Sequence, residues 1–134
     1  MKETFPVRFP AAALTTALLF APLAAFAHGS PPAPVHGGVV SESSGEHWVE
    51  LSVAGDQVTA WVSDADNKPI PAAQLGGKAT ILIDGKTQAI ALNPADANSV
   101  TGKLAAPATG RVTAVLALTA GGKPTQVKFV VPAK

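Results

Sequence analysis

From Val39 onward the chain alternates between short β-prone runs and two-residue turn signals, and no run has helical periodicity. The clearest pair of runs is His47–Ala54 and Gln57–Ser63, joined by Gly55-Asp56. A two-residue loop with Gly in first position favours a type II′ hairpin. The register that this turn sets places six apolar residues on one face: Val49, Leu51, Val53, Val58, Ala60 and Val62.

The opposite face of this hairpin carries both tryptophans of the chain. Glu50 is predicted to lie opposite Trp61, with Trp48 as a diagonal neighbour of Trp61. Extending the ladder by one step places His47 opposite Asp64. The two tryptophans could stack a ligand or dock on a partner protein, or they could pack beneath a loop or the N-terminal arm.

A second hairpin is predicted at Ala79–Ile83 and Lys86–Leu92, around an Asp84-Gly85 type I′ turn. Further strands are expected at Arg111–Thr119, Thr125–Val131, Val39–Ser43 and Val100–Leu104. About six to eight short strands without helices indicate an all-β fold, an antiparallel immunoglobulin-like sandwich. A small closed barrel is the alternative.

The N-terminal segment has the pattern of a signal peptide. Lys2 and Arg8 precede an uncharged, mostly apolar stretch of 13 residues, and Ala25-Phe26-Ala27 is a small-x-small cleavage pattern. A membrane-spanning helix needs about 20 residues. We therefore expect a signal peptide at 1–27, a flexible Pro/Gly-rich arm at 28–38 and a β-domain at 39–134, in a periplasmic protein with no membrane insertion after cleavage.

Composition excludes several kinds of function. The 10 Lys and Arg residues nearly balance the 9 Asp and Glu residues, which argues against a nucleic-acid partner. The absence of cysteine excludes disulfides, thiolate zinc sites, Fe–S clusters and cysteine nucleophiles. No phosphate-binding loop and no nucleophile elbow is present, so we expect a protein that is not an enzyme.

The histidines indicate a metal site. His28, His36 and His47 all lie within the first 20 residues of the predicted mature chain. Imidazole and carboxylate ligands suit copper(II), zinc(II) or nickel(II), and we expect copper(II) or zinc(II) as the cofactor. Cleavage after Ala27 would give His28 a free α-amino group beside its imidazole, a chelating pair called a histidine brace. Asp64 could ligate the metal or orient the ring of His47.

The predicted metal ligands are therefore His28, His36, His47 and Asp64. Other interpretations of the same residues remain open. His36 could be a solvated turn residue, and His47 could be a strand-end residue that caps the core. Cleavage one residue away from Ala27 would abolish the chelate at His28.

A longer pattern points to a family. His36-Gly37-Gly38-Val39-Val40, then a G-x-H-x-x-E-L strand from Gly45 to Leu51, then V-x-x-x-V-x-D-x-x-x-x-P from Val58 to Pro69, resembles small exported bacterial proteins that accompany heavy-metal efflux systems. It also resembles N-terminal segments of periplasmic efflux adaptors. The segment Asp64 to Ala73 is similar to exported immunoglobulin-like modules of the YtkA/FixH type.

The resemblance implies a periplasmic β-sandwich linked to copper, zinc or cobalt handling, with His36 and His47 at matching positions. The expected function is binding of a divalent transition metal in support of envelope metal handling or efflux, with an efflux adaptor or another envelope protein as partner. The alternative is a non-catalytic module that docks on an envelope complex through the Trp48/Trp61 face.

Overall fold

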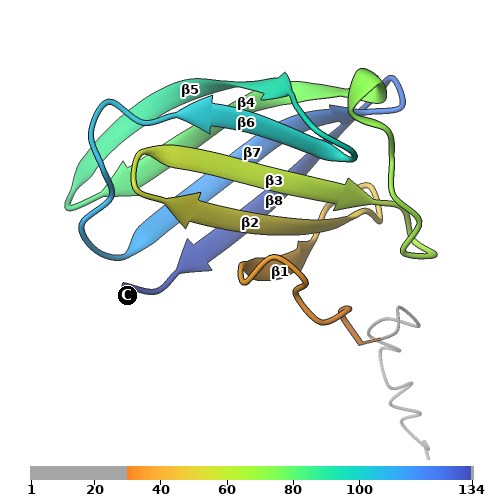
Figure 1. The fold of residues 1–134 in the computed structure, drawn as a ribbon, viewed down its shortest axis with the longest axis horizontal. Coiled ribbons are helices and arrows are strands. Elements are labelled where there is room, and N and C mark those ends of the chain that lie inside the picture. Colours follow the sequence, from red (N-terminus) through yellow and green to blue (C-terminus); the bar gives the residue numbers. More distant parts are fainter. Residues whose placement is uncertain (1–29, 134) are drawn as a thin grey trace, which may run out of the picture.

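The computed structural model describes residues 30–133, so the predicted signal peptide and His28 lie outside the described residues (Figure 1). The described chain forms eight strands and one 3-10 turn: β1 Val39–Glu42, β2 Trp48–Ala54, β3 Gln57–Ser63, η1 Ala72–Gln74, β4 Leu75–Ile83, β5 Lys86–Pro94, β6 Ser99–Lys103, β7 Val112–Ala120 and β8 Lys123–Val131. Among these residues there is no helix of the length and apolarity needed to span a membrane.

The strands are all antiparallel and follow the order β1-β2-β3-β6-β5-β4-β7-β8 in one sheet. The sheet curls so that β2 and β3 cross in front of β7 and β8 (Figure 1). Its two edges meet at the β1–β2 turn, where the Ser44 N–H donates to the Gln126 carbonyl over 2.8 Å. The all-β antiparallel prediction is confirmed, with the strands in a single, nearly closed sheet.

Two separate sheets are not seen, because β5 and β6 join what would be the two halves. The joint is short and consists of Asn93 opposite Thr101 and Pro94 opposite Val100. So short a pairing between β5 and β6 is hard to predict from sequence, because it exists only if β5 extends as far as Pro94. We distinguish below the half formed by β1, β2, β3 and β6 from the half formed by β5, β4, β7 and β8.

The predicted hairpin turns are confirmed. Gly55 has a φ of 61°, whereas the φ of the next residue, Asp56, is negative, as a type II′ turn requires. Asp84 and Gly85 have φ of 51° and 76°, as a type I′ turn requires. The β2–β3 register is the predicted one from Ala54 opposite Gln57 to Trp48 opposite Ser63, so the turn fixes which side chains face inward.

The core lies inside the curled sheet and is made by alternate residues of its strands. All six apolar residues predicted for the inner face of the first hairpin are buried. From the other half, Phe129, Ile81 and Leu116 are the largest side chains that join them. Burying a side chain of this size stabilises the fold by roughly 1.5–3 kcal/mol, so this alternation is the main source of stability.

Two strands begin at least two residues earlier than expected. The strand β4 starts at Leu75 rather than Ala79, so Gly76 and Gly77 are part of it. A Cβ at Gly77 would meet the Ala117 carbonyl oxygen of β7, so the glycine lets the two backbones approach. The strand β8 starts at Lys123 and includes Pro124, which an edge strand tolerates because its missing N–H faces away from the ladder.

Candidate functional site

Glu50 occupies an unusual position for an acidic residue on the outer face of a strand. It lies on β2 with Val40 of β1 on one side and Trp61 of β3 on the other. Such a residue normally points into water, yet Glu50 is only 6% exposed. Residues 35–38, the last part of the Pro/Gly-rich arm, bind it directly through the hydrogen bonds described next.

The carboxylate of Glu50 accepts hydrogen bonds at both oxygens. Oε1 accepts from the backbone N–H of Val35 over 3.0 Å, and Oε2 accepts from those of His36 and Gly38 over 2.8 and 3.0 Å. The Nδ1 atom of the His36 ring lies 3.1 Å from Oε1. Hydrogen bonds to an ionised acceptor are about twice as strong as neutral ones. This carboxylate therefore holds the arm on the sheet.

The two glycines that follow His36 explain why this segment can wrap a side chain so closely. Gly37 has a φ of 72°, a conformation that residues with a Cβ seldom adopt. A Cβ at Gly38 would meet the backbone carbonyl oxygen of Leu51. The sequence His-Gly-Gly is thus needed for the turn and for the close approach of the arm to β2.

The environment of Glu50 favours its charged form. Burial alone would raise the pKa of this carboxyl group. The N–H groups of Gly38 and Val35, together with the side chain and N–H of His36, outweigh burial and lower the pKa below its usual 4.5. Glu50 is therefore ionised at neutral pH and can only accept hydrogen bonds.

The ring of His36 is fixed in two directions. It stacks on Trp61 with ring centroids 3.8 Å apart and an angle of 2° between the planes. The ionised carboxylate of Glu50 can only accept a hydrogen bond, so Nδ1 of His36 is the donor and carries the proton. In the neutral ring the lone pair is then on Nε2. The side chain is 38% exposed. A carboxylate that orients an imidazole in this way is the usual support of a metal-binding histidine.

A small cavity of about 90 Å³ lies beside this ring, between the arm and the two tryptophans. Its walls include Pro32 and Val35 of the arm, Trp48 and Trp61 of the sheet, and Asn98 of the turn before β6. Both tryptophans are half-buried. The stack with His36 agrees with the expectation that Trp61 packs beneath the arm.

His47 lies in a different environment, in the β1–β2 turn. Its backbone N–H donates to the hydroxyl of Ser43, which in turn accepts from the hydroxyl of Thr125 on β8 over 2.7 Å. The Nδ1 atom of its ring is buried and has no hydrogen-bond partner within residues 30–133. His47 belongs to the contact that joins the two edges of the sheet.

Asp64 stabilises a turn. Its Oδ1 accepts from the backbone N–H groups of Asp66 and Lys68 over 3.0 and 2.8 Å. This is an Asx turn, and Asn67 within it has a φ of 61°, a conformation that asparagine tolerates. The ladder between β2 and β3 ends at Trp48 opposite Ser63, one step before the predicted pair of His47 and Asp64.

The four predicted metal ligands are therefore not assembled in the part of the chain that the structure describes. His36 pairs with Glu50, His47 lies in the β1–β2 turn, and Asp64 lies in the turn after β3. Over residues 30–133 no group of three or more His, Asp and Glu side chains is placed to hold one metal ion. His28 lies outside these residues, and its role stays a prediction.

Glu50 is the site residue that the sequence reasoning did not single out. The available signals were its position between two tryptophans on an outer face and its place in the G-x-H-x-x-E-L pattern. A period-of-two pattern shows that Glu50 points outward but cannot show that the arm folds back on it. That contact depends on tertiary structure.

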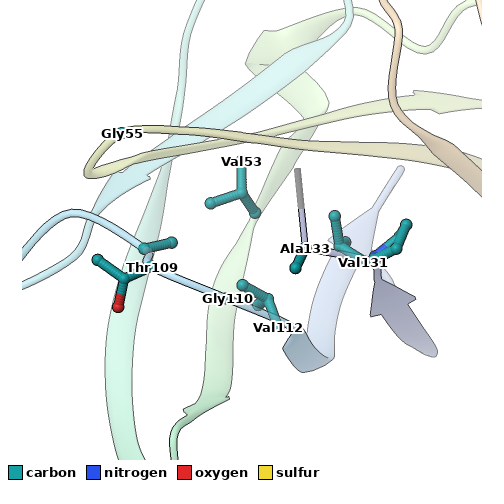
Figure 2. A pocket seen from close by; sticks show the side chains of 9 residues that line it. Val53, Gly55, Thr109, Gly110, Val112, Val131 and Ala133 are labelled. Atoms are coloured by element: carbon teal, nitrogen blue, oxygen red, sulfur yellow. The ribbon is translucent and has the colours of Figure 1, made fainter.

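A larger cavity of about 310 Å³ lies at the end of the curled sheet near the β2–β3 turn (Figure 2). Val53, Val112 and Val131 point into the space between the strands, and Thr109 lies on the loop before β7. Among residues 30–133, those that line this cavity have no titratable side chain. The candidate site is the cluster of Glu50, His36 and Trp61, where a buried carboxylate, an imidazole and an aromatic ring are in contact.

A scan of protein-family models gave no match for this chain, and searches of curated proteins and of solved structures gave no significant match. The function is therefore argued from the cluster itself.

Proposed function

We propose that this protein is an exported β-domain that binds a divalent transition metal, copper(II) or zinc(II), in support of envelope metal handling. His36 is the anchoring ligand through Nε2. The observation that carries the proposal is the pairing of His36 Nδ1 with the buried, ionised carboxylate of Glu50. That pairing fixes the orientation of the ring, and with the proton on Nδ1 it is Nε2 of the neutral ring that has the lone pair for a metal.

A single imidazole does not make a stable site, so other ligands are required. His28 precedes His36 on the same arm and, after cleavage at Ala27, would add an imidazole and an α-amino nitrogen. Amine and imidazole nitrogens suit copper(II) and zinc(II). His47 and Asp64 are held in other turns and are not included in the proposed site.

The test is titration of copper(II) and zinc(II) into the exported, processed protein and three variants. His36→Ala should weaken binding most. Glu50→Gln should weaken it by about 10- to 100-fold, because the orienting carboxylate is lost. His47→Ala is the matched control and should bind like the unmodified protein. Equal affinity of the His36→Ala variant and the unmodified protein would refute the site.

The second candidate is a docking module that uses the Trp48/Trp61 face. The half-buried tryptophans around the 90 Å³ cavity favour it, because tryptophan is enriched at binding hot spots. This function predicts that an envelope protein co-purifies in the presence of chelators and is lost with Trp48→Ala. The His36→Ala variant would separate the two candidates, since metal binding requires the imidazole and docking on Trp48 does not.

A further inference from the structure

Charge is distributed unevenly between the two halves of the sheet. The strands β4, β5, β7 and β8 contain four lysines and neither Asp nor Glu. We call their outward-facing side chains the acid-free face. Two of the lysines, Lys78 and Lys128, are on this face, whereas Lys86 and Lys123 have the parity of the inner face. With four strands of 9 residues each, this face measures about 20 by 30 Å. The strands β1 and β2 and the turns around β3 carry Glu42, Glu50, Asp56, Asp64 and Asp66.

The acid-free face is also the most apolar exposed surface of the described strands. Leu82, Val115 and Val130 are 39–40% exposed, and all three are on it. Leu82 and Val130 both lie opposite Thr113, so they form one row across β4, β7 and β8. Val115 lies in the next row beside Lys128. Aliphatic and cationic side chains are therefore interleaved.

The lysines on this face are available to bind a ligand. Lys78 and Lys128 point outward, are exposed, and form no ion pair within residues 30–133. Lys103, on the other half, is paired with Asp56 at 3.7 Å. Asp84 is the acidic residue closest in sequence to the face, in the β4–β5 turn, and its carboxylate accepts from the Thr109 hydroxyl. No carboxylate among the described residues neutralises Lys78 or Lys128.

The chemistry of the face favours a lipid surface over a protein partner. Stable protein interfaces are usually centred on buried Trp, Tyr or Arg anchors. The four strands of this face have no Trp, Tyr or Arg, and Phe129 points inward and is 2% exposed. Anionic headgroups need no such anchor and attract exposed cations, here Lys78 and Lys128, each of which strengthens adsorption to such a surface about fivefold.

We propose that the acid-free face adsorbs the domain peripherally on a membrane surface rich in anionic phospholipid headgroups. Adsorption orients the molecule, because the acidic half is repelled by the same surface. The cluster of Glu50, His36 and Trp61 lies on that acidic half and faces away from the lipid. The inference depends on export to the envelope but not on metal binding.

The experiment uses the processed protein, purified from the envelope fraction, with two kinds of vesicle. One kind is phosphatidylcholine mixed with phosphatidylglycerol, and the other is phosphatidylcholine alone. Co-sedimentation should occur with the first kind only and should weaken between low salt and about 0.15 M salt. The double variant Lys78→Gln/Lys128→Gln should bind about 25-fold more weakly.

The matched control is Lys68→Gln/Lys103→Gln, which removes the same charge from the other half of the molecule. It should bind nearly as well as the unmodified protein. An equal loss in both double variants would show that net charge, rather than this face, causes adsorption and would overturn the proposal. Absence of binding to the anionic vesicles would overturn it too and would leave an acidic protein surface as the partner to seek.

Discussion

Replacing Glu50 with glutamine tests whether this carboxylate holds the arm on the sheet. The two side chains have nearly the same shape, so the change removes charge and acceptors without opening a cavity. Both carboxylate oxygens accept backbone N–H groups, Oε1 from Val35 and Oε2 from His36 and Gly38. A glutamine amide must therefore point its NH₂ group at a backbone donor in either orientation. Rotation of the amide cannot relieve the conflict.

The expected cost follows from these contacts. A hydrogen bond to a charged group contributes about 1.5–3 kcal/mol, and at least one or two such bonds are lost with the amide. The arm can respond by leaving the sheet, which returns its N–H groups to water. The loss of unfolding free energy is then limited to what docking of the arm contributes. We expect a decrease of about 1–3 kcal/mol and a detached arm.

Native-state amide hydrogen exchange and urea unfolding together measure this effect. In Glu50→Gln the amides of His36 and Gly38 should exchange much faster than in the unmodified protein, while those in the centre of β7 change little. Asp66→Asn is the control, because Asp66 is exposed and its side chain is free of the arm. If Glu50→Gln and Asp66→Asn behave alike in both assays, the carboxylate does not hold the arm.

Three further predictions follow from the same structure. Gly38→Ala should lower the unfolding free energy by about 1–3 kcal/mol, because the new Cβ would meet the Leu51 carbonyl oxygen. Gly76→Ala is the control, because a Cβ there has open space, and it should leave the unfolding free energy nearly unchanged in the same urea experiment. Glu50 has a lowered pKa in the folded state, so its contribution should be complete well above pH 4.5 and lost as the pH falls through the folded pKa. Unfolding measured against pH should show this loss in the unmodified protein and not in Glu50→Gln. Phe129→Ala should cost about 3–5 kcal/mol by thermal or urea unfolding, and a cost below about 1 kcal/mol would contradict its place in the core.

The fold was largely predictable because local rules decide it. Gly55 and the Asp84-Gly85 pair fix two hairpins, and each hairpin fixes which residues face inward. The closing of the sheet was not predictable in the same way. It depends on Ser44 reaching Gln126, 82 residues apart in the chain, and no local pattern encodes that contact.

The candidate site was predictable only in part, for a similar reason. The sequence identified His36 and the tryptophans, and the β2–β3 register placed Glu50 beside Trp61 correctly. It did not identify Glu50 as the partner of His36, because that pairing joins a Gly-rich arm to a strand across 14 residues. Propensities describe the arm as irregular, and they carry no information about which side chain it covers.

The separation of His36 from His47 follows from the period of the strand. Glu50, which binds His36, and Val49, which is fully buried, are neighbours in β2 and point to opposite faces. His47 precedes Trp48 and has the parity of Val49, and the Nδ1 atom of its ring is buried. His36 and His47 are thus kept apart because Glu50, the partner of His36, has one parity on the strand and His47 has the other. For this reason the metal site that we propose on His36 excludes His47 and would need its other ligands from the arm.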